Sequence, residues 1–331
     1  MSARGPVVRQ CAGAVLALAW ALAACADGDR KPVEQVDAGG SEGSGATSGA
    51  SGASEGSGAA SESGGTGGTE PGELQVEFEE LLFEGEPAFL TDFVFYPGRP
   101  DDLLALDKSG LLLHYRIDEQ VALLVASARV EGVYDKLDCG AISLAFEPDF
   151  AEGNFVYVGT CVSQTHSEIL RLDLDEDLNP VEGSQISILS VGDSSASRPW
   201  HNVGSIGFEP GGILWALFGD KVRGAPAQDA TSNLGKLLRI VPSRLPGLGG
   251  FDPAADGPLV GDPLAAEAVY ALGLRSPFRG TRDSRGFYWI GDVGSDLFEE
   301  VNVVRAPLDN FGWPEREGPC EECGESLPPA F

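Results

Sequence analysis

Residues 208–217 read FEPGGILWAL, in which an aromatic residue, an acidic residue and a Pro-Gly turn lead into an apolar run of β-strand character. A related order, with an aromatic residue, then an acidic residue or a Pro-Gly turn, and then an apolar run, occurs at 95–106 and 146–159, and in a weaker form at 281–291. A second β-like run follows each copy, such as GKLLRIV at 235–241. Short strands that repeat at intervals of roughly 50–70 residues, with turn residues between them, predict the four-stranded blades of a β-propeller.

Other fold classes fit the sequence less well. Few windows keep a helical period without Gly or Pro, so we expect no long amphipathic helices. A two-sheet sandwich is the alternative, but sandwiches rarely repeat one hairpin signature four times. We therefore predict an all-β propeller with about four blades between residues 86 and 305. Residues 306–331 are too few for a further blade of about 40 residues, which leaves either a four-bladed closure or an incomplete ring.

The N-terminal residues predict a targeting signal and a tether. Within residues 1–24, Arg4 and Arg9 precede an apolar stretch that ends in small residues before Cys25, as in a bacterial lipoprotein signal peptide. An ordinary secretory signal is the alternative, and the stretch is short for a membrane span. Residues 25–72 are mostly Gly, Ser, Ala, Thr and Glu, which predicts a lipidated cysteine followed by a disordered linker. We expect a protein anchored by lipid in the bacterial cell envelope.

The net charge and the cysteines of the chain bear on nucleic-acid binding, on disulfide bonds and on zinc binding. The formal net charge of −29 argues against nucleic-acid binding, which requires clustered Lys and Arg. Outside the cytoplasm cysteines usually pair, and Cys139 and Cys161 bracket one predicted hairpin, so we predict a disulfide between them. Cys320 and Cys323 have C-x-x-C spacing, but no second Cys or His pair exists to complete a zinc site. Whether these two cysteines pair with each other stays open.

A series of collinear motifs resembles the glucose/sorbosone dehydrogenase family. That family contains soluble sugar dehydrogenases that use pyrroloquinoline quinone (PQQ), together with hedgehog-interacting-protein-like proteins. The resemblance implies a six-bladed propeller, a shortened C-terminal part with about two blades missing, and a domain that covers residues 73–331. The motifs that carry it are DCG at 138–140, FEPDF at 146–150, HNVG at 201–204, GD at 219–220, GKLLRI at 235–240, LGLRSP at 272–277, GDVG at 291–294, EEVN at 299–302 and NFGWP at 310–314.

The resemblance also implies roles at the reaction centre. His201 matches the family's general base, which takes the proton of the sugar C1 hydroxyl, and an imidazole suits this because its pKa lies near neutral pH. Arg275 matches an arginine that faces the quinone. Asp138 and Asn202 fall at positions that line the sugar side.

Further positions imply cofactor contacts, with some departures from the family pattern. Ser276 stands where the family has an asparagine, Glu299 matches an acidic position near the cofactor, and Lys221 is an unusual residue that would pair with a cofactor carboxylate. Main-chain carbonyls of Gly294 and Ser295 match those that help to hold calcium, although the enzymes have proline at the second position.

Two functions follow from these observations. The first is a PQQ- and calcium-dependent aldose dehydrogenase that oxidises a sugar and passes electrons to an unspecified acceptor. The second is a non-catalytic, membrane-tethered propeller that binds protein or glycan, or a truncated inactive member of the family. The absence of the last blades favours the second function. In the enzymes of the family, those blades supply some of the Lys and Arg residues that hold the anionic cofactor.

Overall fold

The computed structural model describes residues 81–85, 87–148, 154–320 and 323–331, and all of them belong to one compact unit. The predicted signal peptide at 1–24, the lipidation site Cys25 and the linker at 25–72 lie outside the described residues and stay predictions. Within the described ranges, no helix has the length and apolar character needed to cross a membrane.

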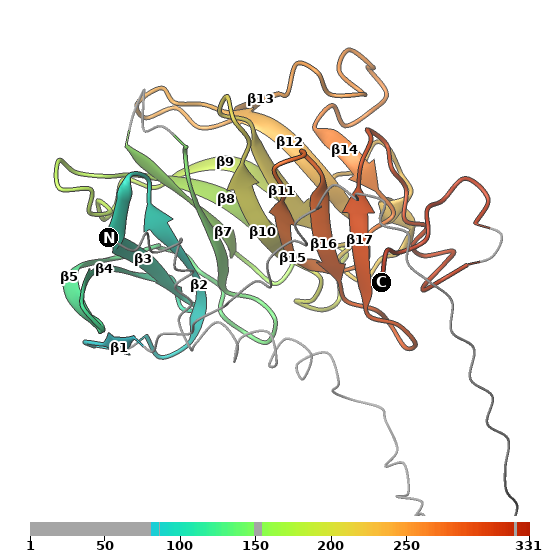
Figure 1. Cartoon of the computed structure of the whole chain (residues 1–331). Helices are drawn as coiled ribbons and strands as arrows, with labels where there is room; N and C mark the ends of the chain where they lie inside the picture. Colours follow the sequence, from blue (N-terminus) through green and yellow to red (C-terminus); the bar gives the residue numbers. More distant parts are fainter. Residues whose placement is uncertain (1–80, 86, 149–153, 321–322) are drawn as a thin grey trace, which may run out of the picture. The chain divides into compact units, whose positions relative to one another are not determined.

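Four antiparallel sheets follow one another along the chain (Figure 1). The first sheet contains β2 (Leu90–Tyr96), β3 (Arg99–Asp107), β4 (Leu111–Asp118) and β5 (Val121–Arg129), with the short β1 (Leu82–Phe83) parallel to β5 at its edge. The second contains β6 (Ala141–Phe146), β7 (Phe155–Cys161), β8 (His166–Asp173) and β9 (Ile186–Gly192). Apart from β1, each strand of these two sheets pairs with the next along the chain, as in a meander.

The third and fourth sheets follow this pattern in part, and the fourth has three strands. The third contains β10 (Val203–Phe208), β11 (Leu214–Phe218), β12 (Lys236–Pro242) and β13 (Phe251–Pro253), and β14 (Val269–Leu272) also pairs with β12. The fourth contains β15 (Pro277–Arg282), β16 (Tyr288–Asp292) and β17 (Glu300–Val304). A single turn of 3₁₀ helix, η1 (Ala225–Ala227), lies between β11 and β12.

The first strand of each sheet lies against the first strand of the next. β2 contacts β6, β6 contacts β10, and β10 contacts β15, which is the arrangement of propeller blades around an axis. The all-β propeller prediction is therefore confirmed, with four blades among the described residues.

Apolar side chains fill the space between blades, and the opening sequence stretch shows how. On β11, Leu214, Ala216 and Phe218 belong to the core shared with the second blade, whereas Trp215 and Leu217 belong to the core shared with the fourth. Alternate residues of a strand point to opposite faces, so a strand between two neighbouring blades must be apolar on both. This explains why the run reads as continuously hydrophobic.

The acidic residue of the repeated signature is buried and paired with arginine. Glu209 accepts hydrogen bonds from Arg239 Nε at 2.6 Å and Nη2 at 3.0 Å, and from the Tyr288 hydroxyl. Glu147, in the preceding copy, accepts hydrogen bonds from Tyr157 and from Arg244. The signature thus contains a turn and a buried glutamate that binds an arginine distant in the sequence. The hydrogen bonds from this arginine offset the free-energy cost of burying the carboxylate.

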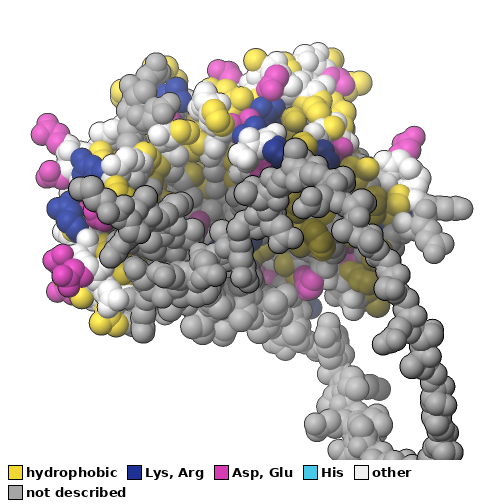
Figure 2. Space-filling view, viewed as in Figure 1, with side chains coloured by type: hydrophobic (Ala, Val, Ile, Leu, Met, Phe, Trp, Pro, Cys, Tyr) yellow, Lys and Arg dark blue, Asp and Glu magenta, His cyan; other side chains and the backbone are white. Residues whose placement is uncertain are grey.

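The visible face of the molecule mixes charge types. Figure 2 shows its Lys and Arg side chains in separate small groups close to Asp and Glu, with apolar side chains between them.

Lys236, at the start of β12, carries a buried amine that makes stability depend on pH. Its Nζ donates to the carbonyl oxygens of Pro226 at 2.6 Å, Ala227 at 2.9 Å and Leu234 at 2.8 Å. Burial lowers the pKa of Lys236 to about 8, only partly opposed by Asp229.

An unfolded lysine titrates near pH 10.4, so between about pH 8 and 10.4 the unfolded state binds more protons and stability rises with pH. From pH 7 to 10.5 we expect wild type to gain up to about 3 kcal/mol of unfolding free energy relative to Lys236→Met. Urea titrations of both proteins at several pH values measure this difference. Parallel pH profiles of the two proteins would contradict the prediction.

Candidate functional site

His201 and Asp220 meet because two adjacent strands place them at the same end of the third blade. His201 lies two residues before β10 and Asp220 two residues after β11, and in the ladder Val203 pairs with Phe218. The His201 Nδ1 atom lies 2.6 Å from Asp220 Oδ1, and both side chains are buried. The sequence motifs HNVG and GD therefore form one histidine–carboxylate pair.

Asp220 is held as an ionised acceptor. Its carboxylate also accepts hydrogen bonds from the main-chain N–H groups of Val222 at 2.7 Å and Gly224 at 2.9 Å, and from Trp313 Nε1 at 2.8 Å. Burial alone would raise the pKa of Asp220, but the hydrogen bond and charge of His201, followed by the other donors, hold that pKa below its ordinary value.

An ionised carboxylate only accepts hydrogen bonds, so it places the imidazole proton on Nδ1 and leaves the lone pair on Nε2. Nε2 of His201 makes no hydrogen bond to a described residue. The pair therefore presents a proton acceptor.

Arg275 joins this network from the fourth blade. Its carbonyl oxygen accepts the N–H of Asp220 at 2.9 Å, and its guanidinium lies 5.3 Å from the centre of the Trp313 ring. Nη1 donates to the carbonyl of Val293 at 2.8 Å, whereas Nε is buried without a partner. His201 and Arg275, predicted to act together, are thus connected through Asp220 and Trp313.

The backbone of the site is strained at three non-glycine residues. His201 has φ 51°, Lys221 has φ 54° and Val222 has φ 62°, all in the left-handed region. Such conformations cost of order 1–3 kcal/mol each, persist only where the surroundings enforce them, and concentrate at functional sites. In addition, a Cβ at Gly204 would overlap the carbonyl oxygen of Pro277, so the glycine of HNVG lets β10 approach β15.

Asn202 and Lys221, predicted to contact sugar and cofactor, bond to each other inside the protein. Lys221 Nζ donates to Asn202 Oδ1 and, at 3.2 Å, to Ser167 Oγ. Lys221 is almost completely buried, and this burial lowers its pKa. Asp138 is half-buried, and burial raises its pKa against the opposing charges of His201 and Lys108. The structure thus brings Asp138 within electrostatic reach of His201.

The predicted disulfide between Cys139 and Cys161 is not formed, because both residues are buried free thiols. Cys139 hydrogen-bonds to Cys161, and its Sγ lies 3.4 Å from Asn202 Oδ1. The hydrogen bond to Cys161 and burial together raise the pKa of Cys139. The two sulfurs are therefore engaged as hydrogen-bonding thiols beside Lys221. The disulfide of the described chain joins Cys320 to Cys323.

The predicted calcium residues lie in the loop after β16, next to Arg275. The N–H of Gly294 donates to Glu299 Oε2 at 3.2 Å, and the N–H of Ser295 donates to Glu317. A Cβ at Gly294 would overlap the carbonyl of Phe298, so this turn requires glycine. The main-chain oxygens of Gly294 and Ser295 accept no hydrogen bond from any residue the structure describes.

No cluster of three or more His, Cys, Asp or Glu suited to a metal ion occurs among the described residues. Ser276 donates its N–H to Asp292 Oδ1 at 2.6 Å, so its main chain faces a carboxylate of the protein. Asp292 is fully buried, and burial raises its pKa to about 7 despite the N–H groups of Arg275 and Ser276.

An open hollow of about 810 Å³, lined by polar side chains and also by Ala225, Pro226 and Leu234, lies near the Asp220 turn. One wall is the loop that follows β9, with Asp193 and Ser195, and the other is the segment from Arg223 to Leu234. Arg223 Nε lies 3.3 Å from Asp193 Oδ2 across this opening. Hydroxyl, carboxylate and guanidinium groups therefore line a hollow that begins three residues after Asp220.

Sequence reasoning did not assign a role to Asp220 or Trp313, although both lie in motifs that it singled out. The signal that would have found Asp220 is an acidic residue two positions after an apolar strand that pairs with the strand following His201. Trp313 is positioned by Gln228, whose Nε2 donates to the Trp313 carbonyl at 2.8 Å and to Asn310 Oδ1 at 2.9 Å.

Solved structures with this fold include sugar dehydrogenases. An oxidoreductase (glucose dehydrogenase) from Thermus thermophilus is 26% identical, with a TM-score of 0.61, over 75% of this chain and 70% of that chain. The PQQ-bound aldose sugar dehydrogenase of Streptomyces coelicolor is 25% identical, with a TM-score of 0.61, over 75% of this chain and 69% of that chain.

Sequence relatives include the HIPL1 protein of Arabidopsis thaliana, which is 26% identical over 73% of this chain. The chain covers 47% of HIPL1 and 33% of the related HIPL2 protein, so it spans less than half the length of these relatives. Residues 91–329 match the family described as Glucose / Sorbosone dehydrogenase, and this match covers most of the chain. The protein therefore belongs to the glucose/sorbosone dehydrogenase family, as its collinear motifs predict.

Proposed function

We propose that this protein is a PQQ- and calcium-dependent aldose dehydrogenase, tethered to the bacterial cell envelope through a lipid on Cys25. The observation that carries the proposal is the buried His201–Asp220 pair, whose unbonded Nε2 is suited to accept a proton. As the proton moves to His201, the ionised Asp220 stabilises the imidazolium that forms.

The residues around this pair fit the two cofactors in part. PQQ is a tricarboxylate, and Arg275 offers a guanidinium with a buried, unpartnered Nε. Calcium takes oxygen ligands, and the carbonyls of Gly294 and Ser295 are open to it, with Glu299 beside them. When bound, the quinone supplies a hydride acceptor and the calcium ion a Lewis acid.

The polar groups of the hollow near the Asp220 turn support a sugar as the substrate class. A sugar presents many hydroxyl groups, which pair well with carboxylates, hydroxyls and guanidinium groups. Asp193, Arg223 and Asp229 supply such groups in this hollow, and Asp138 lies close to His201. We propose that these polar groups bind the sugar.

A non-catalytic, tethered binding propeller is the second candidate. It is favoured by the buried Lys221, whose amine is bonded to Asn202 and Ser167 and so faces protein groups. Arg279 is likewise committed to main-chain carbonyls at the blade axis. The relatives HIPL1 and HIPL2 carry no enzyme designation in their names.

Reconstitution separates the two candidates. With PQQ and Ca²⁺ at about 100 times the dissociation constant, binding adds about 2.7 kcal/mol to the free energy of unfolding, and we expect Tm to rise by several degrees. Dye reduction should then follow addition of an aldose. Arg275→Gln is expected to lose most of the PQQ-dependent rise in Tm. If PQQ does not change the Tm of the wild-type protein and no dye is reduced, the function is that of a binding propeller.

A further inference from the structure

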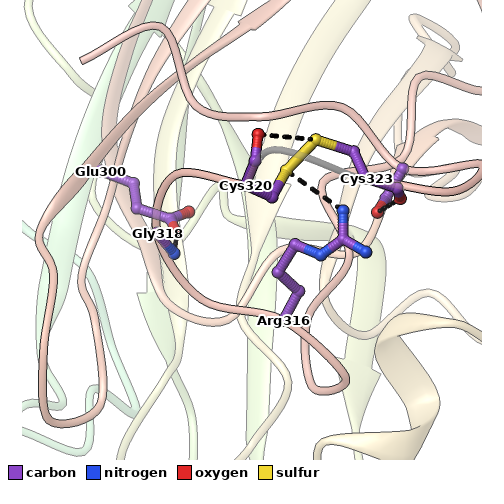
Figure 3. The surroundings of a disulfide bond; sticks show 6 residues. Glu300, Arg316, Gly318, Cys320 and Cys323 are labelled. Atoms are coloured by element: carbon purple, nitrogen blue, oxygen red, sulfur yellow. Dashed lines mark hydrogen bonds between the residues drawn. A yellow bond between two sulfur atoms is a disulfide. The ribbon is translucent and has the colours of Figure 1, made fainter.

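The C-x-x-C segment forms a disulfide whose sulfur faces a cation. Cys320 and Cys323 are joined by a disulfide, and both residues are partly exposed. Arg316 Nη1 donates to Cys320 Sγ at 3.1 Å, and Figure 3 shows the guanidinium directed at that sulfur. The bond therefore joins two partly exposed residues, with a positive charge at one of its two ends.

This arrangement suits the reduced state better than the oxidised one. A neutral disulfide sulfur is a weak acceptor and gains little from a guanidinium, whereas a thiolate gains a charge-assisted hydrogen bond. Nearby Arg or Lys and C-x-x-C spacing are also the features that lower the pKa of a cysteine. Because the two cysteines are only three residues apart, the bond constrains the unfolded chain less than one that closes a long loop.

The surrounding chain is held independently of the disulfide. The N–H of Arg316 donates to the Gly312 carbonyl at 2.9 Å. The N–H of Gly318 donates to Glu300 at 2.5 Å (Figure 3). On the other side, the N–H of Leu327 donates to Asn310 at 2.7 Å. When the disulfide opens, these hydrogen bonds still hold the chain before Cys320 and after Cys323 in place. A reversible exchange site requires this.

We propose that Cys320–Cys323 is a thiol–disulfide exchange site that a protein dithiol reduces, with Cys320 as the leaving sulfur. A thiolate of the partner attacks Cys323 Sγ, the bond to Cys320 breaks, and its electron pair goes to Cys320 Sγ beside Arg316. The second partner thiol then attacks the partner sulfur of the mixed disulfide and releases Cys323. The partner becomes a disulfide, the chain gains two electrons, and the two partner protons end on Cys320 and Cys323 or in solvent.

The rate of reduction under native conditions tests this assignment. The full chain is mixed with dithiothreitol at pH 7, samples are alkylated at intervals, and mass spectrometry follows the peptide that carries both cysteines. A leaving thiol of higher pKa leaves more slowly, so Arg316→Gln should react about three- to tenfold more slowly than wild type. Arg316→Lys, which keeps the charge, should recover part of the rate.

Arg285→Gln is the matched control, because Arg285 pairs with Asp283 on an exposed hairpin and touches neither cysteine. Circular dichroism verifies that each variant is folded. Equal rates for the Arg316 and Arg285 variants would overturn the role of Arg316. Reduction of wild type only after unfolding would show that the bond is a structural staple. Neither result bears on PQQ binding, so this test is independent of the proposed dehydrogenase activity.

Discussion

His201→Asn is expected to lower kcat for aldose oxidation by about 10²–10⁴-fold, the usual contribution of a general base. Asparagine tolerates the left-handed backbone that His201 adopts, with φ 51°, so the substitution removes the base with little added strain. The PQQ-loaded protein is assayed by dye reduction over a range of sugar concentrations. Because the base acts in the chemical step, KM should change much less than kcat.

His166→Asn is the matched control, since His166 is a half-buried histidine whose Nδ1 bonds to Thr165. Asp220→Asn should approach the loss in His201→Asn, because an amide that donates to Nδ1 places the imidazole proton on Nε2. Comparable kcat values for the His201 and His166 variants would remove His201 from the role of base.

The fold was predictable because its signal is local and repeated. The signature at 208–217 sets a turn and a strand, and the structure confirms both, with Gly211 and Gly212 at positive φ in the turn. The signature does not predict which residue pairs with its acidic side chain. Glu209 bonds to Arg239 and to Tyr288, which lies 79 residues further along, and that pairing depends on how neighbouring blades pack.

The site was predictable to the extent that it lay in motifs. His201 and Arg275 lie in motifs that the sequence singled out, but the residues that link them, Asp220 and Trp313, depend on strand register and on a loop 93 residues away. The disulfide was predicted from an expected location outside the cytoplasm and from the positions of the cysteines around a predicted hairpin. Neither of these determines the distance between the two sulfur atoms. As a result, Cys139 and Cys161 were paired wrongly.

The second large effect is expected at the centre of the propeller. Arg279, on β15, donates through Nη1 to the Ile142 carbonyl at 3.1 Å and through Nη2 to the Thr91 carbonyl. Asp92 is partly buried near it and accepts the Leu144 N–H at 2.8 Å. One side chain of the fourth blade thus binds the inner strands of the first two, and its charge opposes the rise that burial imposes on the pKa of Asp92.

Arg279→Met should lower the free energy of unfolding by about 1.5–3 kcal/mol, because it removes the hydrogen bonds of a charged donor to two main-chain carbonyls and the positive charge near Asp92. That is a large part of the 5–15 kcal/mol typical of a folded domain, so urea unfolding at 25 °C should detect it as a lower midpoint at unchanged m.

Without Arg279 the pKa of folded Asp92 rises further above that of the unfolded chain, so the folded state keeps its proton to higher pH. The loss should therefore be smaller at pH 5 than at pH 8. Arg279→Met combined with Asp92→Asn should regain part of the loss, whereas Arg285→Met, at an exposed ion pair, should cost at most about 1 kcal/mol. A loss in Arg279→Met that is equal at both pH values, and unchanged in the double variant, would mean that Arg279 acts through packing and not through the charge of Asp92.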